Sequence, residues 1–308
     1  MTEMIGKYME KLKNGSVQLS PSGLQSLSDL SREEIQVFRQ TWPTIPTERR
    51  RQITRTLVEL AEDNFELDYT AIYKTCVTDI DPQVRAAAVD GLWEDDDPNT
   101  AELLVRIIGS DPAPEVRARA AVSLGHFVYE MELEELDEIV GSKVRNALLA
   151  TIQNNNEELE VRRRAIEAIS YLSDEAITPL LIWAYNHPDL KMRVSAIFGM
   201  GRNCNERWLP NIFSELQSEN PELRFEAVRA CGEMESKRCV PKLIPMLQDT
   251  DVEVRLEAAT ALGKIGGKAA KRALLSILET SEDEQMQEAA EEALEEIDFF
   301  EHPMSFQP

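Results

Sequence analysis

Aromatic residues and histidine are scarce in this sequence. Phe, Trp and Tyr make up 6% of the 308 residues, and the three histidines are His126, His187 and His302. A core with so few rings must consist mainly of Ala, Leu, Val and Ile, which suits closely stacked helices. The sequence also lacks a Gly-rich phosphate loop, a Ser or Cys nucleophile motif and zinc-binding spacing. We therefore expect no enzyme, no catalytic or metal-binding residues and no cofactor.

Long apolar runs are missing as well. No stretch approaches the ~18 to 20 apolar residues that a membrane span requires. The N-terminus, M-T-E-M-I-G-K-Y-M-E, has no apolar core of the kind found in a signal peptide. These absences predict a cytoplasmic protein that does not contact a membrane.

Positive charge is in short supply. The chain has 33 Lys and Arg residues against 56 Asp and Glu residues, a formal net charge of -23. Such a chain repels polyanions over most of its surface, which argues against nucleic acid or an anionic membrane as its main partner. A local basic patch remains compatible with this balance.

The four cysteines include no C-x-x-C pair. Cys231 and Cys239 fall at positions expected to be buried, so small structural hydrophobes are the favoured interpretation. Cys204, in the turn G-R-N-C-N-E, is the one that we expect to be exposed.

The sequence does contain a repeat. Residues 251–266, D-V-E-V-R-L-E-A-A-T-A-L-G-K-I-G, combine an Asp cap, helical apolar spacing, an Arg in the first turn and a Gly-rich exit. The first-turn Arg recurs at intervals of 31 or 32 residues, with one gap of 45, as Arg85, Arg117, Arg162, Arg193, Arg224 and Arg255. Pro179, Pro210 and Pro241 keep the same period and mark the start of a second helix. A two-helix period of this length predicts an α-solenoid.

These residues resemble the HEAT repeats, most closely the short bacterial HEAT-like type described in phycobilisome lyase subunits. That pattern reads D-x-x-V-R-x-x-A-A-x-A-L-G-x-I-G and then A-V-P-x-L-x-x-L, and the copies at 81–89, 114–125 and 251–263 match it. The resemblance covers roughly residues 47–297. It implies an all-α superhelix of about six to seven two-helix repeats with helical caps, and no particular function, since such repeats serve scaffolds, lyases, hydroxylases and regulators.

The domain organisation follows from the repeat. We expect an N-terminal helical cap or arm at 1–46, the repeat solenoid at 47–297 and a mobile C-terminal tail at 298–308. The gap of 45 residues holds an insertion at 129–142, which is expected to form an extra acidic amphipathic turn or short helix. Insertions in repeat proteins often lie at the binding edge. The acidic run 94–97 lacks the spacing of a Ca²⁺ loop and is interpreted as a solvated turn.

Three groups of residues are candidates for function. The recurring Arg residues are interpreted as a structural hydrogen-bonded ladder, with an Asp or Asn four residues before them in most repeats. The second helices are expected to line the concave face, where solvent-facing positions predict a partner-binding site at Leu180, Trp183, Asn211 and Lys242. The alternative, that Trp183 packs over a neighbouring repeat, is equally open. The basic edge comprises Arg207, Lys237, Arg238, Lys268, Lys271 and Arg272.

The basic edge either binds an anion or is simply solvated. It would accept an acidic peptide, a phosphate or a nucleic-acid backbone. Iron-dependent hydroxylases among the HEAT-repeat proteins use His-Glu pairs, and none of the three histidines is followed by Glu. The sequence therefore predicts a non-enzymatic scaffold that binds a protein partner through its concave face and edges. A bilin lyase or chromophore-protein chaperone subunit is the alternative, and a nucleic-acid or phosphate binder is a third.

Overall fold

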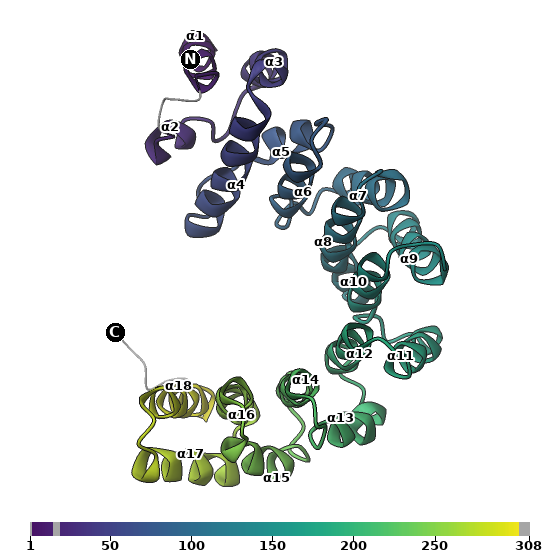
Figure 1. The fold of residues 1–308 in the computed structure, drawn as a ribbon, viewed down its shortest axis with the longest axis vertical. Coiled ribbons are helices and arrows are strands. Elements are labelled where there is room, and N and C mark those ends of the chain that lie inside the picture. Colours follow the sequence, from purple (N-terminus) through teal and green to yellow (C-terminus); the bar gives the residue numbers. More distant parts are fainter. Residues whose placement is uncertain (1, 15–18, 302–308) are drawn as a thin grey trace. The chain divides into compact units, whose positions relative to one another are not determined.

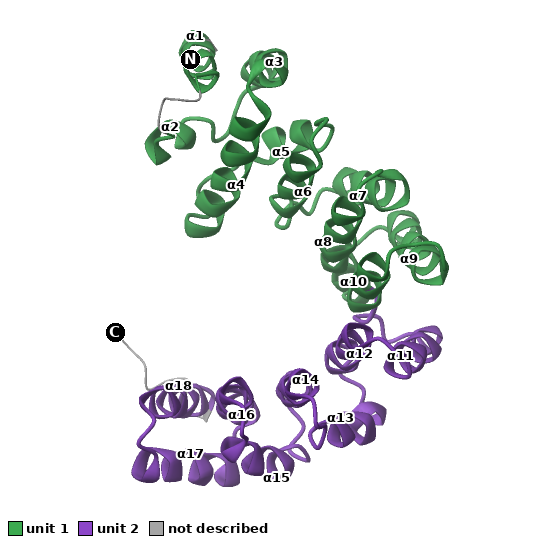
Figure 2. Ribbon diagram, viewed as in Figure 1, with its two compact units in different colours: residues 1–168 green, residues 169–308 purple. Residues whose placement is uncertain are grey.

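The computed structural model of the chain describes residues 2–14 and 19–301. Over these residues it contains helices and no strand, so the predicted all-α class is confirmed. The chain divides into two compact units, residues 1–168 (unit 1) and residues 169–308 (unit 2), as Figure 2 shows. No helix among the described residues is both long and apolar enough to cross a bilayer.

Unit 1 begins with three helices outside the repeat. Its α-helices are α1 (Thr2–Leu12), α2 (Pro21–Gln25), α3 (Arg32–Thr41), α4 (Thr47–Asp63), α5 (Thr70–Cys76), α6 (Pro82–Asp90), α7 (Pro98–Ser110), α8 (Pro114–Glu132), α9 (Glu138–Gln153) and α10 (Leu159–Ile169), the last ending at the unit boundary. A short 3-10 helix, η1 (Trp42–Thr44), follows α3.

Unit 2 continues the alternation of two helices per repeat. Its α-helices are α11 (Thr178–Tyr185), α12 (Leu190–Arg202), α13 (Leu209–Glu215), α14 (Pro221–Glu233), α15 (Val240–Leu243), α16 (Val252–Ile265), α17 (Lys268–Thr280) and α18 (Glu284–Glu301). Three 3-10 helices accompany them, η2 (Glu175–Ile177), η3 (Glu206–Trp208) and η4 (Ile244–Gln248).

The helices of each unit form two layers (Figure 1). In unit 1, α4, α6 and α8 pack successively and form one layer. Helices α5, α7 and α9 form the second layer, packed against the first. In unit 2, α12, α14, α16 and α18 pack successively and form the inner layer of a curve. Helices α11, α13, α15 and α17 form its outer layer (Figure 2). This stacking of helix pairs confirms the predicted solenoid.

The sequence markers lie where they are needed to start helices. Pro179, Pro210 and Pro241 occupy the first turns of α11, α13 and α15, where a missing N–H costs no hydrogen bond. Asp251 caps α16, since its carboxylate accepts from the N–H groups of Glu253 and Val254. The same kind of cap begins α6, α12 and α14.

Gly266 ends α16 with a φ of 66°, as expected for the Gly-rich exit of 251–266, but other glycines near the ends of the repeat helices do not end them. Gly201 and Gly263 lie inside α12 and α16. A Cβ on Gly201 would lie 2.8 Å from the Cα of Ala230 in α14, and one on Gly263 would lie 2.9 Å from the Cα of Ala293 in α18. Glycine is present there because successive inner-layer helices approach too closely for a side chain.

The regions outside the regular repeats are packed helices. Ile5, Met9 and Leu12 of α1 are buried, and α1 packs against α3. At the other end, α18 continues to Glu301, so the first four residues of the expected C-terminal tail are helical. Residues 302–308, including His302, lie outside the described residues.

Of the two forms expected for the insertion at 129–142, the structure has a turn and no separate helix. Its residues complete α8, make a turn in which Glu134 has a φ of 60°, and begin α9. The extra length goes mostly into the flanking helices, since α8 has 19 residues and α9 has 16. Tyr129, Leu133 and Ile139 remain exposed on the surface of this segment.

Candidate partner-binding site

The four residues predicted to bind a partner all lie on the outer layer of unit 2. Leu180 and Trp183 belong to α11, Asn211 to α13 and Lys242 to α15. Because these helices are on the outside of the curve in Figure 2, the prediction that they line the concave face is wrong. Both helices of a repeat expose a solvent-facing stripe, and spacing alone does not show which way the stack bends.

Trp183 is partly exposed on α11. Its side chain keeps 37% of its accessible surface, and the adjacent Ile182 keeps 45%. The Trp183 ring meets the ring of His187 edge to face, with the centroids 5.4 Å apart. Together Ile182 and Trp183 make a small apolar patch on the outer layer, which stays a candidate contact surface.

Acidic side chains of neighbouring repeats neutralise half of the basic edge. The ion pairs join Arg207 to Glu175, Arg238 to Glu206 and Lys271 to Asp298. Lys237, Lys268 and Arg272 are exposed. The field of this edge is therefore weaker than its cluster of cations suggested, because three of the six charges have carboxylates beside them.

The recurring Arg residues bind groups on both sides of their own repeat. Nε and Nη2 of Arg85 donate to the carboxylate of Asp111 at 2.7 and 2.8 Å, and Nη1 donates to the carbonyl of Asp79 at 2.9 Å. Other repeats use the same type of partner, Glu157 for Arg117, Glu215 for Arg193, Asp249 for Arg224 and Asp283 for Arg255. Arg162 donates from Nε to the carbonyl of Ile152 at 3.0 Å.

The acids that pair with these Arg residues differ from those that the sequence suggested. The Asp and Asn residues four positions before the Arg cap helices instead, as Asp251 does before Arg255. Four of the five partner carboxylates lie in the loop that leads to the next repeat, and the fifth, Glu215, is the last residue of α13. The earlier Arg50, which binds Asp79 with both side chains almost fully buried, extends the series by one member. Its sequence signal was the run Arg49, Arg50 and Arg51 at the start of α4.

An open pocket lies on the inner layer of unit 2. Its volume is about 370 Å³, and its lining residues are Val194, Pro221, Glu222, Phe225, Glu226, Asp251 and Glu253. They come from α12, α14 and the start of α16. The pocket lining thus combines three apolar residues, among them Val194 and Phe225, with four carboxylates, and none of its lining residues is basic.

On the same inner-layer helices, Arg guanidinium groups lie over the faces of aromatic rings. The guanidinium carbon of Arg229 lies 4.7 Å from the centroid of the Phe198 ring, and that of Arg202 lies 5.2 Å from it. Arg202 also lies 5.3 Å from the Tyr171 ring. Half-buried Tyr, Phe and Arg are the residue types enriched where proteins bind one another.

The inner layer also holds partly buried acid. Burial raises the pKa of Glu257 on α16, while the charges of Arg229 and Lys264 lower it and that of Glu233 raises it again. Glu226 is almost fully buried, and its carboxylate lies 3.5 Å from Nε of Arg229. Arg229 offsets part of the charge of both acids, so the exposed negative charge at the pocket comes mainly from Glu222 and Glu253.

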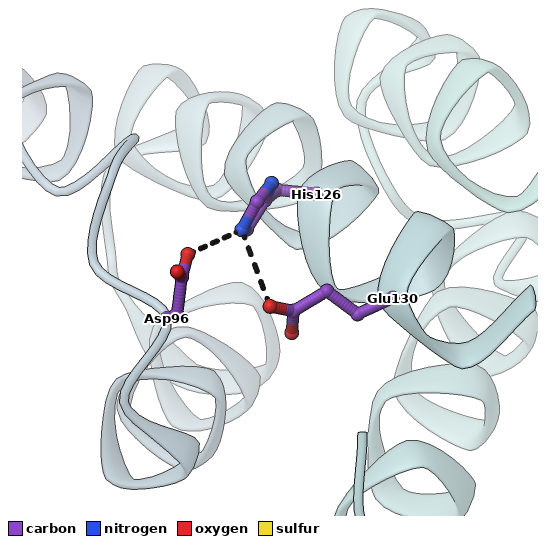
Figure 3. Close-up of side chains that lie close together, drawn as sticks. All are labelled: Asp96, His126 and Glu130. Carbon is purple, nitrogen blue, oxygen red and sulfur yellow. Dashed lines mark hydrogen bonds and ion pairs between the residues drawn. The ribbon is translucent and has the colours of Figure 1, made fainter. Parts of the chain in front are cut away.

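One cluster of possible metal ligands was missed by the sequence reasoning. Nε2 of His126 lies 2.7 Å from Oδ1 of Asp96 and 3.5 Å from Oε1 of Glu130 (Figure 3). Among the described residues, Asp96, His126 and Glu130 are the three possible metal-ligating side chains that lie close enough together to share one ion. The available signal was the i, i+4 spacing of His126 and Glu130, together with Asp96 about one repeat period earlier.

The comparisons with known proteins concern the fold. The family model described as HEAT repeats matches residues 70–154 and 209–295, which together are more than half of the chain. The X-ray structure of YibA from Escherichia coli has 20% identity and a TM-score of 0.50 over 92% of this chain and 99% of that one. No curated protein matches the sequence.

A second solved structure is the complex of CpcE and CpcF of phycocyanin lyase from Nostoc sp. PCC7120. It has 16% identity and a TM-score of 0.49, and covers 75% of this chain and 95% of that one. Neither similarity says what this chain binds. With the family model matching both halves of the helix stack, the chain belongs to the HEAT repeat family.

Proposed function

We propose that this chain is a non-enzymatic HEAT-repeat scaffold that binds a protein partner through the inner layer of unit 2. The observation that carries the proposal is the pocket whose lining combines the apolar Val194 and Phe225 with four carboxylates. A pocket of this kind accepts an apolar side chain with a basic neighbour. The partner segment should therefore be rich in Lys or Arg next to Leu, Ile or Phe.

The chemistry of the pocket supports a peptide-like ligand. Apolar contact with Phe225 would supply most of the affinity, because aromatic side chains in partly enclosed sites dominate interface energies. The rim acids Glu222 and Glu253 are exposed, so they would act mainly by steering a cationic segment toward the pocket. The formal charge of -23 adds to this preference for a basic partner.

The alternatives derived from the sequence depend on free cations. A bilin's propionates or a nucleic-acid backbone would need the basic edge, where Arg207, Arg238 and Lys271 lie beside carboxylates. No feature of the described residues favours either ligand over a protein. The proposal accordingly places the protein in the scaffold or adaptor class, in the cytoplasm, with no cofactor required for binding.

A peptide-display selection on the full-length chain tests this proposal. Peptides enriched from a random library would be synthesised, and their affinity measured by fluorescence anisotropy. We expect basic, apolar sequences whose affinity falls by about tenfold or more in Phe225→Ala, as for an interface hot spot. Trp183→Ala on the outer layer is the matched control, and it should bind like the wild type. Circular dichroism confirms that both variants are folded.

Two results would overturn this assignment. If the selected peptides bind Phe225→Ala as well as the wild type but lose affinity for Trp183→Ala, the binding surface is the outer patch. If no peptide is enriched, a change in bilin absorbance on mixing or salt-dependent retention on DNA would replace the scaffold by one of its alternatives.

A further inference from the structure

Two elements of unit 1 bring Asp96, His126 and Glu130 together. His126 and Glu130 lie one turn apart on α8, so their side chains project from the same face of that helix. Asp96 belongs to the turn between α6 and α7 and faces His126 from across the gap between the repeats, as Figure 3 shows. The three ligand atoms all lie within 4.8 Å of one another.

The neighbours of Asp96 are committed to other partners. Asp95 binds Lys74 at 2.7 Å and accepts a hydrogen bond from the hydroxyl of Thr100. Asp97 caps α7 and also lies within ion-pair distance of Lys74. Asp95 and Asp97 thus bind Lys74 or cap α7, whereas Asp96 faces His126 on α8.

The cluster has more negative charge than its single imidazole can balance. Burial raises the pKa of Glu130, His126 lowers it, and the charges of Asp96 and Glu135 raise it again. The Glu130 side chain is 14% exposed, whereas those of His126 and Asp96 are 38% and 68% exposed. A cation placed between the two carboxylates would relieve their repulsion, and it would be reachable from solvent on the Asp96 side.

We propose that Asp96, His126 and Glu130 form a binding site for a divalent transition-metal ion of the Zn²⁺ class. An imidazole with two carboxylates is a ligand set that Zn²⁺ accepts, and three protein ligands leave a fourth position for water. Ca²⁺ is disfavoured because it takes roughly six to eight oxygen ligands, and a nitrogen occupies one of three positions here.

The two separations that involve His126 suit such an ion. Metal–ligand distances of about 2.0–2.2 Å put neighbouring ligand atoms about 3 to 3.5 Å apart. The Glu130 contact is already at 3.5 Å, and the 2.7 Å Asp96 contact needs only a small outward movement of an exposed carboxylate. The bound ion would join the turn after α6 to the end of α8 and stabilise the contact between two successive repeats.

Isothermal titration calorimetry of the untagged full-length chain with Zn²⁺ tests the site. We expect one equivalent to bind the wild type, and an affinity lower by at least about tenfold in both His126→Ala and Glu130→Gln. The second variant keeps the shape of Glu130, so the result does not depend on whether the first folds. His187→Ala removes a histidine from unit 2 and should bind Zn²⁺ like the wild type.

Co²⁺ as a spectroscopic substitute identifies the ligand atoms. Coordination by nitrogen and oxygen gives visible d–d bands without the thiolate charge-transfer band that Cys204 would produce. The proposal is overturned if the wild type binds no Zn²⁺, if His126→Ala or Glu130→Gln binds it unchanged, or if the Co²⁺ spectrum contains the thiolate band. None of these readouts depends on a protein partner, so they test the metal site independently of the proposed scaffold function.

Discussion

The guanidinium of Arg224 binds the carboxylate of Asp249 through two nearly parallel hydrogen bonds. Nε donates to Oδ2 at 2.8 Å and Nη2 donates to Oδ1 at 2.7 Å, while Nη1 donates to the carbonyl of Ser218 at 2.9 Å. Both side chains are largely buried. Arg224 on α14 therefore binds both the loop that precedes α14 and the loop that precedes α16.

Arg224→Ala should destabilise unit 2 strongly. Removing the Arg leaves the buried Asp249 carboxylate with a much weaker set of donors, which costs about 3 kcal/mol for a broken buried pair. The urea midpoint, followed by circular dichroism, measures the loss. Arg238→Ala is the control, because its pair with Glu206 joins side chains that are 64% and 59% exposed. That control should change the stability by less than about 1 kcal/mol. Equal midpoints for the two variants would mean that the Arg ladder is not structural.

The stability of the repeats should decrease in acid. Burial alone would raise the pKa of Asp111, Glu157 and Asp249, but hydrogen bonds from their Arg partners and from nearby backbone N–H groups hold each pKa below its usual value. A depressed folded-state pKa contributes stability that is fully present above the unfolded pKa, about 3.9 for Asp and 4.3 for Glu. That contribution is lost as the pH falls through the folded pKa, so the decline begins below about pH 4.

Urea midpoints measured from pH 7 downward test this dependence. Arg224→Ala should have a smaller acid-dependent loss than the wild type, since the pKa of Asp249 is no longer held down by that Arg. A wild-type stability that stays constant to pH 2 would contradict the assignment.

Gly201→Ala should destabilise the stack, although alanine favours helices. The new methyl would overlap the backbone of Ala230, and forcing α12 and α14 apart costs about 1–3 kcal/mol. Gly109 on α7 is the matched control, because a Cβ there meets no atom within 4 Å. Gly109→Ala should stabilise the protein by about 0.5–1 kcal/mol. Thermal unfolding of the two variants should therefore give midpoint shifts of opposite sign, and a shared sign would show that the helices adjust freely.

Binding of a basic peptide to the inner layer should weaken as salt increases. Exposed carboxylates around the pocket accelerate association with a cationic segment, and ions screen that attraction. Glu222→Lys should lower the association rate by about tenfold at low ionic strength and reduce its salt dependence. Glu279→Lys changes the net charge equally but lies on α17 of the outer layer. Stopped-flow fluorescence compares them, and identical rates would exclude steering by the pocket rim.

Much of the fold could be read from the periodic positions. The first-turn Arg and the second-helix Pro marked where helices begin. Each repeat needs the same residue types at the start of its helices, so these residues recur once per period. The Gly-rich exit was right for Gly266, which ends α16, but Gly263 and Gly201 lie inside helices. Their role depends on how near α14 comes to α12, which is a distance between helices and has no local signature.

The candidate sites were harder to predict. Trp183 is partly exposed, but it belongs to α11, and the curvature of unit 2 places that helix in the outer layer. In the sequence, Phe225 and Val194 are not distinguished from other apolar residues of the repeat helices. The pocket that they line forms only where α12, α14 and the start of α16 come together. His126 and Asp96 are 30 residues apart in the sequence, and they come into contact only because successive repeats stack on one another.

The sequence by itself determined the family, the helix pairs and the Arg in each first turn, because these follow from local spacing and from a period that repeats along one dimension. Only the tertiary structure decided the carboxylate partner of each Arg, the direction in which unit 2 curves and the meeting of Asp96, His126 and Glu130. The physical reason is that these features depend on how one repeat is rotated and displaced against the next. That small rotation is set by side-chain packing across the interface, such as Gly201 against Ala230, and has no counterpart in a linear pattern.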